Sequence, residues 1–524
     1  MTESMSVPAR LQSAAHSSPR SRIIVPSADG EVADTNLGEL WDESLRVAAS
    51  MRELGVEPGT VVAAQLPNWR ECLITHSAAW LCGAVLLPII PIYGTHEVAY
   101  ILRQSRAKLF VAEGRWRGRG VTGRFDTLDE LEHLKHRVVV GGTPVPGSVA
   151  YADLAAPRTE SFEPHAPGSE DERCLLVYTS GTTAAPKGVQ HTHAPLLREL
   201  QSAQERRGAR PDAASLAAFP SGHIAGAMGI LRMLTRTSLT VVMDKWDPVE
   251  AVRLIATHQI HSSAGAPIYL NGILDVADDR GVDLSCLEEY TTGAANVSPE
   301  LIRRADRWGI AAFRCYGSTE HPTISSGVPE DPLDKRALTD GRLMPGTEIR
   351  LIDDDGRDVA RGFDGEILTR GPELFIGYTD SELNRTSFVD GWFRTGDIGR
   401  LDADGYLCIT DRKKDIIVRG GENISSKEVE DALLEHPAVA QVAAVATPDE
   451  RYGERVCVFV VLRAGSDINL SEIRAHFEAQ GMARQKTPER LEVVDELPRN
   501  PSGKVQKQVL RSALQAERTG RASV

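Results

Sequence analysis

Two kinds of pattern are missing from the sequence. None of the seven cysteines forms a CxxC pair, which argues against a zinc site or a disulfide framework and favours reduced, buried thiols. The longest uncharged apolar run, residues 77–93, contains Pro88 and Pro91, and these would interrupt a membrane-spanning helix. We therefore expect a core helix followed by a strand in this stretch.

Positive charge is also scarce. The chain has 59 Lys and Arg against 73 Asp and Glu, a formal net charge of -14, whereas a protein that binds nucleic acid or an anionic membrane would carry clustered Lys and Arg. Residues 1–22 lack the apolar stretch of a secretion signal, so we expect a flexible tail and a cytoplasmic location. A small-molecule substrate is favoured.

The order of elements predicts the fold class. Apolar strands alternate with helices up to about residue 340, which indicates a parallel sheet with helices on its faces. Turns at Asp355-Gly356 and Asp404-Gly405 then predict hairpins in an antiparallel or barrel-like unit, residues 340–413. We therefore expect an α/β protein with a large N-terminal domain of mixed and parallel sheets, residues 23–413, and a small α+β C-terminal domain, residues 414–524.

One loop carries a strong chemical signal. The stretch from Tyr178 to Val189 reads YTSGTTAAPKGV and follows an apolar strand. Its small residues let backbone N–H groups point into one concavity, its hydroxyls can donate to phosphate oxygens, and Lys187 adds positive charge. It does not match the GxxxxGK[ST] loop of common NTPases. Taken alone, the stretch also fits a Ser/Thr-rich surface turn.

Five further motifs follow in a fixed order. They are Tyr316-Gly-Ser-Thr-Glu320, Trp392-Phe-Arg-Thr-Gly-Asp397, Asp411-Arg-Lys-Lys-Asp415, Gly420-Gly-Glu-Asn423 and Pro498-Arg-Asn-Pro-Ser-Gly-Lys504. With the loop ending in Lys187, this set resembles the adenylate-forming superfamily of acyl-CoA synthetases, aryl-acid ligases, adenylation domains and luciferase. The resemblance runs from about residue 30 to the end of the sequence. Segments such as Gly222-His-Ile-Ala-Gly226 look most similar to bacterial CoA ligases for fatty, alicyclic or steroid-derived acids.

The resemblance implies two half-reactions and the residues that perform them. A carboxylate attacks the α-phosphate of ATP and expels pyrophosphate, and the acyl group then passes to a thiol, with CoA as the expected second substrate. Catalysis would fall to Lys187, His223, Thr319, Glu320 and Lys504, with Glu320 also holding Mg²⁺. The ATP site would comprise Thr179, Ser180, Gly181, Thr182, Thr183, Lys187, Gly293, Ala294, Ala295, Tyr316, Gly317, Ser318, Thr319, Asp397, Arg412 and Lys504.

The remaining implied roles concern the acyl group and the thiol. His223, Gly226 and His321 would line the acyl pocket, although a lone His in an apolar segment is as often structural. Lys414 would be the hinge about which a mobile C-terminal domain turns, and Gly420 with Gly421 would border the CoA tunnel.

Three hypotheses follow from these motifs. The first is a CoA ligase for a hydrophobic acid. The second is an adenylating enzyme with another acid or oxyanion, such as an aryl acid or nitrite, and another acceptor, a carrier-protein thiol acting in trans or an amine. The third, a catalytically silent nucleotide-binding protein, predicts loss of the charged motif residues, yet all are present. A homodimer is compatible with each.

Overall fold

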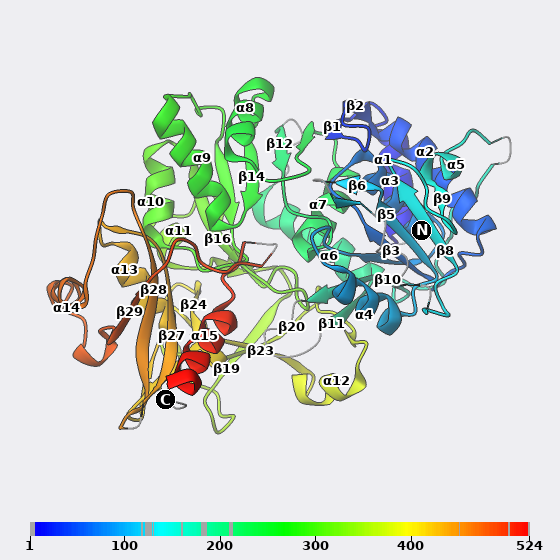
Figure 1. The fold of residues 1–524 in the computed structure, drawn as a ribbon. Helices are drawn as coiled ribbons and strands as arrows, with labels where there is room; N and C mark the ends of the chain where they lie inside the picture. Colours follow the sequence, from blue (N-terminus) through cyan, green and yellow to red (C-terminus); the bar gives the residue numbers. More distant parts are fainter. Residues whose placement is uncertain are drawn as a thin grey trace.

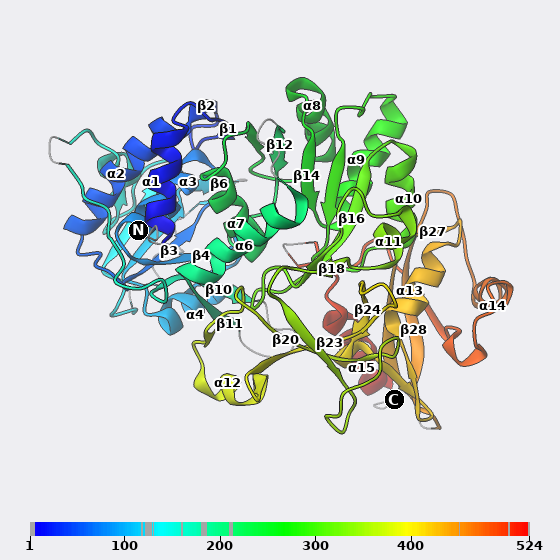
Figure 2. The same cartoon turned by 180° about the vertical axis from the view of Figure 1, so that it is seen from behind.

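The computed structural model describes residues 6–116, 119–120, 128, 130–158, 161–179, 186–208, 213–449, 451–500 and 503–521. Figures 1 and 2 show the N-terminal and central parts side by side, with a third sheet and the C-terminal part beneath them. Among the described residues, no helix combines the length and the hydropathy that a membrane span requires.

The N-terminal part contains an eight-stranded sheet. Its strands, in spatial order, are β21 (Gly377–Tyr378), β11 (Lys187–Thr192), β10 (Arg173–Thr179), β4 (Val85–Pro88), β3 (Val61–Gln65), β5 (Leu109–Glu113), β8 (His136–Val140) and β9 (Val149–Ala150). The strands from β10 to β9 are parallel, and β11 and β21 add antiparallel pairs at one edge. Apolar residues make up β4 and all of β5 except its last residue, Glu113, as expected for strands covered on both faces.

The central part contains a nine-stranded sheet. Its order is β18 (Arg342–Leu343), β17 (Ser325–Ser326), β16 (Ala311–Tyr316), β15 (Glu289–Thr292), β14 (Ser262–Gly265), β12 (Ser215–Ala217), β13 (Thr240–Val242), β1 (Arg22–Pro26) and β2 (Val32–Asn36). The pairs from β16 to β1 are parallel, which confirms the predicted parallel sheet.

Helices cover both sheets. Those of the large domain are α1 (Val7–Ser17), α2 (Leu37–Glu53), α3 (Arg70–Leu81), α4 (Thr95–Ser105), α5 (Tyr151–Leu154), α6 (His193–Arg207), α7 (Ile224–Met233), α8 (Pro248–His258), α9 (Pro267–Arg280), α10 (Pro299–Arg307), α11 (Leu333–Leu338) and α12 (Ser381–Ser387). Asn36 caps α2 by accepting from the Glu39 amide. One core cluster joins the two sheets through side chains of α2, α3, α6 and α7.

Helix α1 corrects the prediction of a flexible tail over residues 1–22 for Val7–Ser17, while residues 1–5 lie outside the described residues. The Ser6 hydroxyl accepts from the Ala9 amide and caps the helix, and Pro8 lies in the first turn, where its missing N–H costs nothing. Val7, Leu11 and Ala14 lie on one face of the helix and are buried in the main core. The Ser- and Ala-rich composition suggested a tail, but the spacing of these few apolar residues decides the structure.

The predicted barrel-like unit over 340–413 is an open sheet. Its order is β19 (Glu348–Ile352), β20 (Gly365–Arg370), β23 (Trp392–Leu401) and β22 (Phe388–Val389), with β24 (Leu407–Arg412) also paired to β23. No pairing among the described residues closes this five-stranded sheet into a barrel. The turn at Asp404-Gly405 joins β23 to β24, as predicted.

The C-terminal part is a small α+β unit. Its sheet consists of β26 (Glu422–Ile424), β25 (Ile417–Arg419), β28 (Gly453–Leu462), β27 (Val439–Asp449) and β29 (Arg490–Val493), and its helices are α13 (Ser426–Leu434), α14 (Leu470–Ala479) and α15 (Lys507–Arg521). Short 3₁₀ turns span Lys413–Asp415 and Arg484–Lys486, and β6 (Arg115–Trp116) pairs with β7 (Arg119–Gly120) elsewhere in the chain. The domain boundary at residue 414 stays a prediction.

Candidate active site

A cavity of about 1440 Å³ opens where the N-terminal part, the central part, the five-stranded sheet and the C-terminal part meet. Its walls include residues at or just beyond the carboxyl ends of the parallel strands β12, β14, β15 and β16, the edge at which open α/β sheets bind ligands. Side chains from the five-stranded sheet and from the C-terminal part complete the wall. Residues that are far apart in the sequence therefore share one site.

A carboxylate lies between a phenol and a guanidinium on one side of the cavity. The Tyr316 hydroxyl donates to Asp397 Oδ2 at 2.7 Å, and Arg412 Nε lies 3.1 Å from Asp397 Oδ1. Asp397 and Arg412 are opposite each other on β23 and β24, so the sheet register brings the pair together. The Asp397 charge raises the pKa of Arg412. Three residues predicted for the ATP site thus form one bonded group.

The loop after β16 is held from two neighbouring strands. Gly317 is required there, because a Cβ would lie 2.1 Å from the carbonyl oxygen of Pro322. His191 Nε2 donates to the Thr319 carbonyl at 2.8 Å, and the Tyr378 hydroxyl donates to Glu320 Oε1 at 2.7 Å. Ser318, Thr319 and Glu320 all line the cavity, as predicted.

The predicted phosphate loop begins and ends at the cavity wall. Thr179 and Lys187 are cross-strand partners in the β10–β11 hairpin, and both line the cavity. Lys187 Nζ lies 5.4 Å from the centre of the Tyr378 ring, beside the group that binds Glu320. The intervening predicted residues, Ser180, Gly181, Thr182 and Thr183, lie outside the described residues.

A further segment predicted for the ATP site, residues 293–295, follows β15. A Cβ at Gly293 would lie 2.7 Å from the Cys315 carbonyl oxygen, and Ala294 has a φ of 63°, a left-handed conformation that is uncommon outside glycine. Gly293 and Ala294 line the cavity, whereas Ala295 is not part of its wall.

Lys504 reaches the cavity from the C-terminal part. The Asn500 side chain accepts from the Lys504 amide at 2.8 Å, and the Asn500 amide donates to the Lys504 carbonyl at 2.8 Å, which fixes the turn. Burial lowers the pKa of Lys504 to about 7, and the nearby cations of Arg412 and Lys414 contribute, while Asp397 opposes the change. The Lys504 ammonium is therefore poorly solvated, and a bound anion would stabilise its charge.

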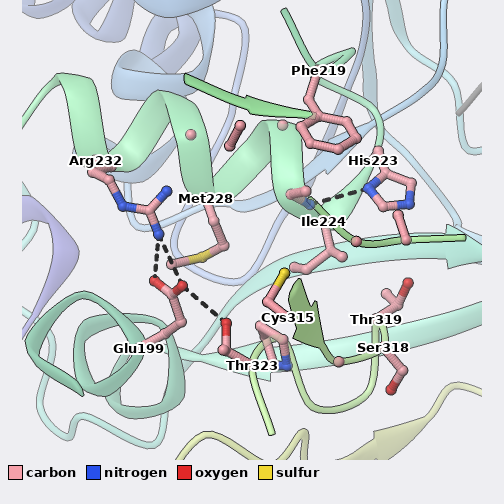
Figure 3. Close-up of a pocket in the computed structure, with 18 of the residues that line it drawn as sticks. Glu199, Phe219, His223, Ile224, Met228, Arg232, Cys315, Ser318, Thr319 and Thr323 are labelled. Carbon is pink, nitrogen blue, oxygen red and sulfur yellow. Dashed lines mark hydrogen bonds and ion pairs between the residues drawn. The ribbon is translucent and has the colours of Figure 1, made fainter. Parts of the chain in front are cut away.

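His223 lies at the start of α7 and lines the same cavity (Figure 3). Its Nδ1 accepts from the Ala225 amide at 3.2 Å and caps the helix. Burial, reinforced by the Lys504 charge, lowers the pKa of His223 to about 4, so the ring is neutral at pH 7 and its proton resides on Nε2. Phe219 stacks on the ring with centroids 5.8 Å apart.

The other residues predicted for the acyl pocket differ in their placement. Gly226 lines the cavity, and a Cβ there would lie 1.9 Å from the Pro220 carbonyl oxygen. His321 does not line it, and this prediction is wrong. The His321 side chain turns away from the cavity, is fully buried, and places Nδ1 3.1 Å from Thr369 Oγ1.

The residues predicted for the hinge and the CoA tunnel lie near the start of the C-terminal part. Lys414 lines the cavity from the 3₁₀ turn, and Arg511 on α15 binds the adjacent Asp415 at 2.5 Å. Gly420 and Gly421 form the turn between β25 and β26 with φ of 58° and 89°, and neither lines the cavity. Their roles stay predictions.

The sequence did not reveal the residues that hold the loop after β16, nor the ion pair between α6 and α7. His191 and Tyr378 lie on β11 and β21 and belong to no motif, so only the pairing of these strands reveals them. Glu199 on α6 and Arg232 on α7 also line the cavity and form an ion pair at 2.8 Å. No local pattern in the sequence joins two helices in this way.

Comparison with known proteins agrees with this geometry. Residues 11–379 match the AMP-binding enzyme family and residues 428–504 match the AMP-binding enzyme C-terminal domain. The chain is 35% identical over 463 residues to the medium-chain fatty-acid–CoA ligase of Escherichia coli K12, covering 87% of this chain and 82% of that protein. It is 33% identical to the 2-hydroxy-7-methoxy-5-methyl-1-naphthoate–CoA ligase of Streptomyces carzinostaticus, covering 98% and 93%.

A solved structure extends the comparison to three dimensions. The anthranilate CoA ligase AuaEII in complex with anthranoyl-AMP superposes with a TM-score of 0.89 at 25% identity, covering 99% of both chains. Fold, site and comparisons together define an adenylate-forming enzyme, and the chain belongs to the AMP-binding enzyme family. Within that family it is an AMP-forming acid–CoA ligase that uses ATP.

Proposed function

We propose that the acid activated by this ligase is hydrophobic, and that its acyl group lies along α7. Ile224 and Met228 are one helical turn apart and line the cavity beyond His223, with Cys315 of β16 also in the wall (Figure 3). The relatives named above act on a medium-chain fatty acid and on a substituted naphthoate. Apolar walls of this kind bind an acyl group by removing its surface from water.

Adenylation joins two anions, so positive charge is needed where they meet. The acid carboxylate oxygen bonds to the α-phosphorus of ATP, the bond to the β-phosphate bridging oxygen breaks, and pyrophosphate leaves. Lys504 would stabilise the charge that gathers on the carboxylate and the α-phosphate, and Lys187 would bind the departing phosphates. The His223 Nε2–H would donate to the carboxylate. The placement of Lys504 in the cavity wall with His223 and Asp397 carries this proposal.

The nucleotide and its metal would be held by the bonded groups around β16 and β23. Asp397 would accept from the ribose hydroxyls, with Arg412 fixing the carboxylate. Mg²⁺ takes oxygen ligands and commonly combines one or two carboxylates with substrate phosphates, and Glu320 offers a carboxylate beside Thr319. The metal would offset phosphate charge when bound, while Tyr378 orients the Glu320 side chain.

Thioester formation requires the CoA sulfur to attack the acyl carbonyl, with AMP as the leaving group. The CoA sulfur needs access to the acyl carbonyl, and Lys504 would have to leave the cavity to give it room. We propose that the C-terminal part turns about Lys414 and brings Gly420 and Gly421 to the path of the thiol. Cytoplasmic location, a homodimer and a carrier protein in trans stay predictions from the sequence.

Acid-dependent exchange of pyrophosphate into ATP tests the proposal. We expect exchange with straight-chain and bicyclic hydrophobic acids without CoA, and AMP with acyl-CoA when CoA is added. Exchange with short polar acids alone would contradict the proposed substrate class. The variant Asp397→Asn is the matched control, since it retains the shape of the side chain and removes the charge between Tyr316 and Arg412. We expect it to lose exchange with every acid, because the proposed ribose contact is weakened.

A further inference from the structure

The cavity wall changes from apolar to charged along α7. Ile224, Met228 and Arg232 follow at intervals of four residues, so they lie on one face of the helix. Figure 3 shows His223 and Phe219 at one end of this face and Arg232 with Glu199 at the other. A rise of 1.5 Å per residue separates the Cα levels of Ile224 and Arg232 by roughly 12 Å. This row of side chains on α7 therefore spans the length of the acyl group, from the end at which the acid carboxylate reacts to the charged end of the wall.

The far end holds a hydrogen-bonded ion pair. Arg232 Nη2 donates to both oxygens of Glu199, at 2.8 and 3.0 Å, and the Thr323 hydroxyl donates to Glu199 Oε1 at 3.3 Å. The Glu199 side chain is 6% exposed and the Arg232 side chain 30% exposed. Among the described residues, the hydrogen bonds of Arg232 run from Nη2 alone, which leaves Nε and Nη1 as donors.

Positive charges outnumber negative charges at the Arg232 end of the cavity. The guanidinium groups of Arg207, Arg232 and Arg236 line the wall with the carboxylates of Glu199 and Glu289, and these charges influence one another. In the part of the chain that the structure describes, three cations therefore face two anions. Glu373 lies close to Glu199, but burial raises its pKa to about 8, so it is mostly protonated at pH 7 and does not restore the balance.

A purely hydrophobic acyl group would leave these donors without acceptors. Burying a charged donor against a hydrocarbon chain costs free energy, whereas an oxygen acceptor at that point gains a charge-assisted hydrogen bond. We propose that the preferred acid carries an oxygen function at its far end, bound by Arg232, with an apolar span between the two ends. The positive excess favours a carboxylate over a carbonyl. This inference rests on the proposed function and specifies its substrate.

Matched acids test the inference. Straight-chain acids of about six to fourteen carbons are compared with the ω-oxo and α,ω-dicarboxylic acids of equal length. The extended lengths of these acids bracket the roughly 12 Å between Ile224 and Arg232 along α7. We expect one length at which an oxygenated acid exceeds the plain acid by about tenfold or more in kcat/KM for pyrophosphate exchange, with the dicarboxylate ahead of the oxo acid. Equal or better use of plain acids at every length would overturn the inference and leave the proposed function intact. Exchange with none of these acids would overturn both.

Two variants separate recognition from folding. Arg232→Met alone leaves Glu199 buried without its partner and can unfold the helix pair, so Arg232→Met with Glu199→Gln serves as the neutral pair. We expect this double variant to lose the preference for oxygenated acids while it retains exchange with plain acids and its thermal melting transition. A double variant that folds, uses plain acids and still prefers oxygenated ones would show that Arg232 does not bind the distal group.

Discussion

At the scale of single residues, the charge state of Lys504 controls adenylation in this account. The pKa of the free enzyme's Lys504 is lowered to about 7, so the stabilising cation is present below that pH and is lost as the pH rises through it. We expect kcat/KM for the acid to fall on the alkaline side with an apparent pKa near 7, because kcat/KM reports the free enzyme. The measurement is the pH profile of acid-dependent pyrophosphate exchange.

The bound substrates and an arginine variant provide the controls for this profile. Bound ATP and acid bring negative charge to Lys504, so the alkaline limb of kcat should lie at higher pH than that of kcat/KM. Lys504→Arg keeps its charge at every pH used and should lack this limb even if its rate is low. A limb that persists unchanged in Lys504→Arg would assign the titration to another group.

His223 combines a structural and a functional contact. Its Nδ1 caps α7 and its Nε2–H faces the cavity, so His223→Ala removes both and we expect a loss of about 1 kcal/mol in stability, with a raised KM for the acid. His223→Asn can restore the cap through its shorter side chain without reaching the carboxylate. We therefore expect normal stability and a raised KM in His223→Asn, measured by urea unfolding and exchange kinetics. Normal KM in both variants would contradict the contact with the acid.

At the scale of elements, α1 is part of the core. Leu11 is buried against the helices between the two sheets, so Leu11→Ala should destabilise the large domain by about 2–5 kcal/mol. Gln12 is exposed on the same helix, and Gln12→Ala should leave stability unchanged. The readout is the midpoint of the first unfolding transition in urea, and equal midpoints for the two variants would show that α1 does not contribute to the core.

The turn at Lys413–Asp415 is the element at which rotation is proposed. A hinge depends on backbone torsions, so Lys414→Pro should slow acyl transfer to CoA much more than adenylation, while Lys414→Ala should affect transfer less. Single-turnover formation of the acyl-adenylate and its subsequent conversion by CoA measure the two steps separately. If Lys414→Pro impairs both steps equally, the hinge lies elsewhere.

At the scale of the whole molecule, contacts between the parts fix the arrangement in which Lys504 enters the cavity. Asn296 of the central part donates to Glu430 and Asp431 of α13 at 3.3 Å, and a Cβ at Gly503 would lie 3.2 Å from Ile268 Cγ2. The hydrogen bonds of Asn296 make this interface polar where the central part meets α13. Such an interface is of the kind expected between domains that move relative to each other.

Much of this architecture could be predicted from the sequence, because local signals and global fold agree. The alternation of apolar strands with helices was recognised from local patterns, and the ordered motifs indicated the superfamily. The sequence predicted a barrel-like unit where the structure has an open sheet. Hairpin turns such as Asp404-Gly405 predict antiparallel pairing but not whether the sheet closes. The helix α1 was missed because three apolar side chains in a Ser- and Ala-rich segment gave a weak periodic signal.

The site could be predicted only where a motif carries its residues. Asp397, Arg412 and Lys504 were identified by motif, and the structure places all three in the cavity wall. His321 was misplaced because adjacent residues in an irregular loop point in different directions, which the sequence does not specify. The ion pair of Arg232 with Glu199 depends on the packing of two helices, and no spacing along the chain encodes it.

Lys504 is proposed to serve the first half-reaction and to leave the site for the second. The most direct measurement compares wild type with Lys504→Ala in acid-dependent pyrophosphate exchange and in the conversion of a supplied acyl-adenylate to acyl-CoA. We expect exchange to fall by about 100-fold or more in the variant, since a positioned charge in a site shielded from water is lost, while conversion remains close to wild type. Equal loss in both reactions, or full exchange by Lys504→Ala, would contradict the account.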